Sequence, residues 1–142
     1  MKSNELRFNL LVGKFLGMNS QETQDVIEQL RGHRDRLREV SAIVDGQHPL
    51  RRDAKERAQS LMKSAKEALR ADHERMSTVS GQNSLNPTED AFLRPAVHES
   101  FSHLQVKWNS SPSAAWSSDL YEAITDLEFS LRQLETPQTS EG

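Results

Sequence analysis

Five histidines are the residues of this chain best suited to chemistry, because imidazole binds metal ions and exchanges protons near neutral pH. They are His33, His48, His73, His98 and His103. His98 and His103 are five residues apart, which would place them about 140° apart around a helix rather than on one face. Neither Glu-x-x-His nor His-Glu-x-x-His occurs, so the ligand spacings of di-iron bundles and zinc proteases are absent. We therefore expect no built-in metal site and no cofactor.

An enzyme is the least favoured of three functional hypotheses. The chain has no cysteine, no Gly-x-Ser-x-Gly and no phosphate-binding Gly-Lys-Ser/Thr, so the usual nucleophile and nucleotide motifs are missing. A carboxylate–histidine site would have to use Glu99 with His98 or His103. An Arg–His pair of the kind found in some helical nucleases would need Arg94 and His98, but Pro95 directly after the arginine argues against a shared helical face. We expect a protein that is not an enzyme.

Basic side chains gather in the middle of the chain. Residues 31–75 carry twelve basic and eight acidic groups, a balance of +4, whereas residues 76–142 carry three and nine, a balance of −6. The candidate partner-binding residues are Arg31, Arg34, Arg38, Arg51, Arg52 and Lys55. They could bind an anionic partner, or they could pair with local acidic residues while the acidic C-terminal part packs beside them. We favour pairing, because a pI near 6.0 is not typical of a nucleic-acid binder.

Residues 12–28 resemble the turn of a helix-turn-helix, in which a glycine makes the turn and a later apolar pair packs the second helix. Gly17, Val26 and Ile27 occupy suitable positions. Thr23 stands where an apolar core residue is usual, and acidic side chains such as Asp25 would repel phosphates. A nucleic-acid-binding regulator, using residues 12–28 or the basic hairpin tip at residues 31–57, is therefore the alternative hypothesis.

Two long amphipathic segments, residues 20–44 and 50–77, are the elements that must position these groups. The apolar positions of the first are Val26, Leu30, Leu37, Val40 and Val44, with His33 in the remaining gap. Those of the second are Ala54, Ala58, Leu61, Ala65 and Ala68, flanked by Met62, Leu69 and Met76. This spacing is typical of helices with one apolar stripe each. The short connector, with Asp45-Gly46 and Pro49, makes the two helices antiparallel neighbours.

Glycines, prolines and capping residues divide the rest of the chain. We expect a short helix at residues 3–16, a polar loop at 77–86, and a helix start at Asn86 with Glu89 as its capping partner. Pro95 should interrupt the helix, leaving a turn at 87–94 and a helix at 95–108, although alternating apolar residues at 104–108 leave a strand open there. A last helix should span 112–135. The sequence therefore predicts an all-α, antiparallel helical bundle of four main helices plus a short N-terminal helix, in one domain at 1–135 with a disordered tail at 136–142.

The leading functional hypothesis is a non-enzymatic helical-bundle protein that acts through protein–protein interaction or self-association. The alanine-rich hairpin buries little area by itself, so its stripes could pair with a protein partner or, as we favour, in a homodimer; the basic hairpin tip is the other candidate surface. No run approaches the roughly 20 apolar residues of a membrane span, so we expect no membrane contact. The lack of cysteine suits a reducing compartment and favours a cytoplasmic location.

Overall fold

The computed structural model describes residues 20–46, 51–104 and 113–135, and in these ranges it contains helices and no strand. The elements are α2 (Ser20–Gly46), α3 (Arg52–Ser77), α4 (Val79–Asn83), the π-helical turn η1 (Glu89–Leu93), α5 (Arg94–Ser102) and α6 (Ser113–Glu135). The predicted all-α bundle is confirmed, and the three long helices agree with their predicted bounds to within two residues. The predictions for residues 1–19, 47–50, 105–112 and 136–142 lie outside the described residues.

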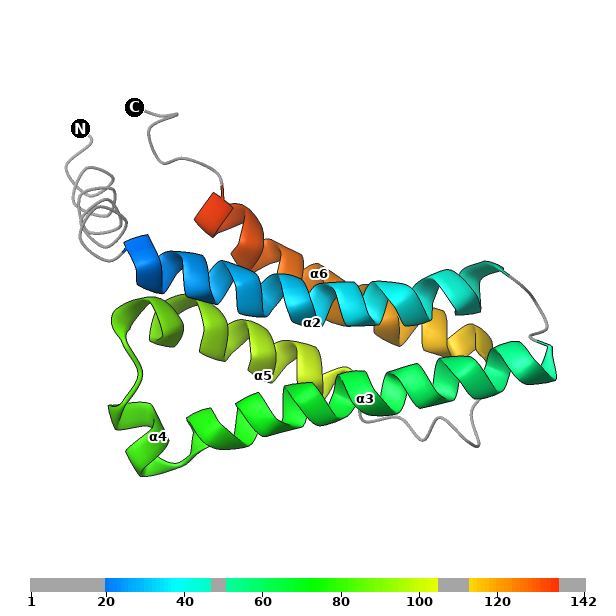
Figure 1. Ribbon diagram of the computed structural model, residues 1–142, viewed down its shortest axis with the longest axis horizontal. Helices are drawn as coiled ribbons and strands as arrows, with labels where there is room; N and C mark the ends of the chain where they lie inside the picture. Colours follow the sequence, from blue (N-terminus) through cyan, green and yellow to red (C-terminus); the bar gives the residue numbers. More distant parts are fainter. Residues whose placement is uncertain (1–19, 47–50, 105–112, 136–142) are drawn as a thin grey trace.

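The four larger helices pack as antiparallel neighbours. In Figure 1, α2 and α3 lie near each other where α2 ends and α3 begins and diverge toward their other ends, α5 lies in the wedge between them, and α6 crosses behind α2. α2 packs mainly against α6 and α3, and α5 packs against the same two helices. Arg31 contacts Glu135, whereas Ser117 contacts Asp45. Residue numbers therefore rise along α2 as they fall along α6, which makes these two helices antiparallel.

The buried core confirms the predicted stripe of α2 and shifts that of α3. The five apolar stripe residues of α2 are completely buried, and His33 is buried among them. On α3, the buried positions are Ala58, Met62, Ala65, Leu69 and Met76. Ala54, Leu61 and Ala68 are only partly buried. The helix is thus rotated so that its larger methionine and leucine side chains, which remove more apolar area from water, face the core.

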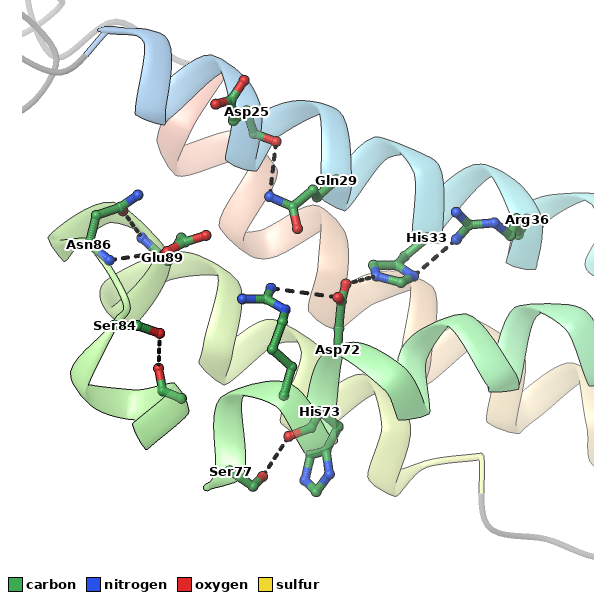
Figure 2. Close-up of polar contacts among 12 residues, drawn as sticks. Asp25, Gln29, His33, Arg36, Asp72, His73, Ser77, Ser84, Asn86 and Glu89 are labelled. Carbon is green, nitrogen blue, oxygen red and sulfur yellow. Dashed lines mark hydrogen bonds and ion pairs between the residues drawn. The ribbon is translucent and has the colours of Figure 1, made fainter. Parts of the chain in front are cut away.

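The segment around Pro95 differs from the prediction. The helix starts as expected, because the Glu89 amide donates to Asn86 Oδ1 (2.8 Å) and the Asn86 amide donates to Glu89 Oε1 (3.1 Å) (Figure 2). It then continues through Pro95 to Ser102 instead of breaking. The turn before the proline is π-helical, with the Arg94 amide donating to the Glu89 carbonyl. This wider turn accommodates a residue that lacks an N–H donor and whose ring needs space.

The predicted polar loop at 77–86 also contains a short helix, α4. The Thr78 side chain caps it by accepting a hydrogen bond from the Gly81 amide (2.9 Å). α5 in turn ends at Ser102, earlier than predicted, and Leu104 in the following turn is buried. Among the helices described, none is both long and apolar enough to cross a membrane.

Candidate functional site

Two of the basic residues on α2, Arg31 and Arg38, form ion pairs with α6 along the line where the two helices meet, here called the seam. Arg31 Nη2 is 2.6 Å from Glu135 Oε2, and Arg38 forms an ion pair with Glu128. Arg34 pairs with its neighbour Asp35 at 3.0 Å. An acidic last helix therefore does pack beside the basic segment, as the pairing interpretation predicted.

The other predicted basic residues lie at the start of α3. Arg51 precedes the helix, Lys55 is partly buried, and Arg52 pairs weakly with Glu56 at 3.4 Å while 93% of its side chain stays exposed. Because α2 continues to Gly46, Arg31 lies about 22 Å along the helix axis from its end. The structure thus separates the six candidates into a seam group and a tip group instead of one cluster at the hairpin turn. Their role in partner binding stays a prediction.

The described half of the helix-turn-helix-like segment presents acidic groups. Thr23 is buried, as its predicted core position requires, whereas Asp25 and Glu28 are exposed. A cavity of about 400 Å³ beside them is lined by Asp25, Glu28, Gln29, Asn86 and Glu89. Three carboxylates around one cavity oppose phosphate binding at this surface. DNA binding by residues 12–28 stays a prediction.

His33 joins α2 to α3 through a hydrogen bond to a carboxylate. Its Nε2 lies 2.7 Å from Asp72 Oδ2, and Arg36 Nη1 lies 3.0 Å from its Nδ1 (Figure 2). Burial by itself would raise the pKa of the Asp72 carboxyl, but the hydrogen bond from His33 and the nearby charges lower it below its ordinary value. This arrangement satisfies a buried polar residue and leaves no open coordination position at the ring.

His73 on α3 and His98 on α5 form a stacked pair. His73 Nε2 lies 3.2 Å from His98 Nδ1, and the two rings stack with centroids 5.3 Å apart. A cavity of about 270 Å³ adjoins them, lined by His73, Met76, Ser77, Gln82, Arg94 and His98. Arg94 and His98 thus border one cavity, but the Arg94 guanidinium is paired with Asp90 at 2.9 Å.

His103 has the most ligand-like surroundings in the described part of the chain. Its Nδ1 lies 3.1 Å from Glu122 Oε1 and its Nε2 lies 2.9 Å from Asp126 Oδ2. One ligand atom each from Glu99, His103 and Asp126 lies within 4.8 Å of the other two. Glu99 and His103 are four residues apart at the end of α5, and Glu122 and Asp126 are four apart on α6. The two helices therefore face each other with an acidic surface around one imidazole.

The carboxyl groups around His103 influence one another. Burial raises the pKa of Asp126, the charges of Glu99 and Glu122 add to the rise, and His103 opposes it only in part. Burial and the charge of Glu122 likewise raise the pKa of Asp119. Because each carboxylate makes its neighbours harder to ionise, this surface favours the approach of a cation.

The outer face of α6 carries two exposed aromatic side chains. Tyr121 is 71% exposed and Phe129 is 60% exposed. Thr125 lies midway between them and is also exposed. Residues at four-residue spacing share one face of a helix, so these three form a stripe that points away from the core.

Comparisons with protein families, with curated proteins and with solved structures find no match to this chain. The sequence hypothesis of a carboxylate–histidine site around Glu99 and His103 is correct about the proximity of these two residues. His98 points to His73 instead. The sequence analysis missed Asp126 and the exposed aromatics. Tyr121 and Phe129 lie outside the apolar stripe of α6, which is formed by Trp116, Leu120, Ala123, Leu127, Leu131 and Leu134. This position could have revealed their exposure from the sequence.

Proposed function

We propose that this chain is a non-enzymatic helical-bundle protein that acts by self-association, with the outer face of α6 as its interface. The observation that carries the proposal is the exposure of Tyr121 and Phe129. The described ranges contain five phenylalanine, tyrosine and tryptophan residues, and of these only Tyr121 and Phe129 are exposed. Aromatic side chains are the common anchors of protein interfaces, because each removes a large apolar area from water when covered.

The apolar stripes of α2 and α3 are not available as the interface. The α2 stripe is covered within the chain by α3 and α6, and Met62, Leu69 and Met76 of α3 are buried. Self-association through these stripes, which the low bulk of the hairpin suggested, would require the bundle to open. The interface therefore belongs on the outer surface.

The spacing along the outer face of α6 suits a second copy of the same helix. Tyr121 and Phe129 each lie about 6 Å along the axis from Thr125. A twofold axis beside Thr125 would make two α6 helices antiparallel and place Tyr121 of one copy against Phe129 of the other. It would also bring Arg132, whose side chain is 72% exposed, to within about 6 Å of the partner's Glu122 along the axis, but it places Glu128 level with the partner's Glu122. The spacing of the aromatic side chains, and not the charge, is therefore self-complementary across this twofold.

Two aromatic anchors expose less area than the roughly 800 Å² per partner of a stable interface. We therefore expect a reversible dimer with a dissociation constant on the order of 10–100 μM. Sedimentation velocity at increasing concentration should show a monomer–dimer equilibrium at low and at physiological salt. The double variant Tyr121→Ser/Phe129→Ser should shift the equilibrium to monomer.

Val79→Ser is the matched control, because Val79 is an exposed apolar residue (77%) on α4, away from α6. This variant should dimerise like the wild type. A wild-type monomer at several hundred micromolar would overturn the proposal. So would a monomer that carries nucleic acid removable by salt, which would instead favour the regulator hypothesis and the basic tip around Arg51 and Arg52.

A further inference from the structure

The geometry points to a divalent metal site formed by Glu99, His103 and Asp126, which bridges the end of α5 and the middle of α6. Their donor atoms lie within 4.8 Å of one another. In tetrahedral coordination, two donors at about 2.0–2.2 Å from one Zn²⁺ lie about 3.3–3.6 Å apart. Side-chain rotations that move a donor atom by about 1–1.5 Å, which is a small change for partly exposed side chains, would bring all three donors onto one ion.

The way the two ring nitrogens of His103 are placed also supports this assignment. A metal-bound histidine usually donates its second ring N–H to a carboxylate, which fixes the tautomer and the ring orientation. Glu122 Oε1 lies 3.1 Å from Nδ1, while Nε2 faces Asp126 at 2.9 Å. Glu122 is therefore placed to orient the ring, and Nε2 is left to bind the metal beside Asp126.

The donor set selects the class of ion. Two carboxylates and one imidazole suit Zn²⁺, Mn²⁺ or Fe²⁺, whereas Ca²⁺ and Mg²⁺ prefer oxygen donors only. Glu99 is exposed and His103 keeps 31% of its side chain accessible, so water can occupy the remaining coordination positions. A bound ion would also offset the mutual repulsion of the carboxylates on this surface.

Titration calorimetry with ZnCl₂ on the full chain tests the site, with the visible spectrum of added Co²⁺ as a report on coordination. The wild type should bind one Zn²⁺ that excess Mg²⁺ does not displace. Asp126→Asn and His103→Gln should each lose this binding, and Glu122→Gln should weaken it about 10–100-fold. Far-UV circular dichroism would show that each variant remains helical.

His98→Gln is the matched control, because His98 lies on the same helix but faces His73 at 3.2 Å, on the other side of α5. This variant should bind Zn²⁺ like the wild type. Loss of binding in His98→Gln with normal binding in His103→Gln would overturn the assignment and move the site to the His73–His98 pair. Absence of Zn²⁺ binding by the wild type at tens of micromolar would overturn it as well.

Discussion

His33 occupies a position in the α2 stripe where the pattern otherwise places valine or leucine. An arginine side chain can only donate hydrogen bonds, so the contact from Arg36 makes Nδ1 the acceptor and assigns the ring proton to Nε2. That proton is donated to Asp72 at 2.7 Å. Both ring nitrogens are thus satisfied inside the bundle, and the histidine joins α2 to α3.

Asp72 should make the stability of the bundle depend on acid pH. Its pKa in the folded chain lies below the ordinary value of 3.8. The stabilisation is therefore complete above 3.8 and is lost as pH falls from 3.8 through the lower folded value. We expect Asp72→Asn to reduce the free energy of unfolding by about 1–2 kcal/mol near neutral pH. Urea unfolding of both proteins should show this difference shrinking below 3.8.

Asp35→Asn serves as the control for the loss of one negative charge, since Asp35 is exposed on α2. It should cost much less near neutral pH than Asp72→Asn does. A difference between wild type and Asp72→Asn that stays constant down to the lowest pH would show that the charge of this carboxylate does not stabilise the fold.

Replacement of two helical glycines by alanine should change the stability of the protein in opposite directions. A methyl group on Gly32, in the middle of α2, would meet the Arg36 side chain at an ordinary 3.5 Å. We expect Gly32→Ala to stabilise the protein by about 0.5–1 kcal/mol through higher helix propensity. A methyl group on Gly81 would overlap the carbonyl oxygen of Arg75, so Gly81→Ala should displace α4 from the end of α3 and lower stability by about 1–3 kcal/mol.

Thermal unfolding of both variants checks this prediction. Amide hydrogen exchange at Ser84, whose N–H bonds to the carbonyls of Ser80 and Gly81, would locate the change at α4. Equal effects of the two substitutions on stability would show that the close approach of Gly81 to Arg75 does not constrain how α4 packs against the end of α3.

At the level of elements, periodicity and capping predicted most of the fold. The long helices have strong stripes and clear ends, and the Asn86–Glu89 capping pair formed as expected. The prediction that Pro95 interrupts the helix was wrong. The rule that proline breaks a helix rests on the hydrogen bonds of an α-helix, whereas the turn before Pro95 is π-helical. The shifted stripe of α3 reflects a tertiary choice: alanine and methionine fit the same periodicity, and packing decides which of them faces inward.

For the whole molecule, the seam between α2 and α6 should contribute measurable electrostatic stability. We expect Arg38→Glu to lower stability by about 1 kcal/mol, because it places two acidic side chains opposite each other. The charge reversal Arg38→Glu/Glu128→Arg should recover most of the loss. Arg52→Glu is the control, since Arg52 has only a weak local partner at the start of α3. Chemical unfolding at low salt measures all three, and failure of the double variant to recover would contradict a direct pairing.

Of the three residues of the candidate metal site, the sequence could place only Glu99 and His103 together. Glu99 and His103 are four residues apart, a spacing that places both on one helical face. Asp126 lies 23 positions after His103, and only the antiparallel packing of α5 against α6 brings it close. The exposed aromatics differ in this respect, because Tyr121 and Phe129 lie outside the apolar positions of α6 and the sequence pattern already indicated that the core does not cover them.

The seam between α2 and α6 also joins residues that are far apart in the chain, as Arg31 and Glu135 are separated by 104 positions. α2 therefore meets its most extensive partner only after every other described helix has been synthesised. During translation, the nascent α2–α3 hairpin must leave the ribosome with its valine and leucine side chains uncovered on the side that α6 will occupy. Cooperative folding should thus begin when α6 emerges, and nascent chains stalled before residue 113 should be the forms that chaperones recognise.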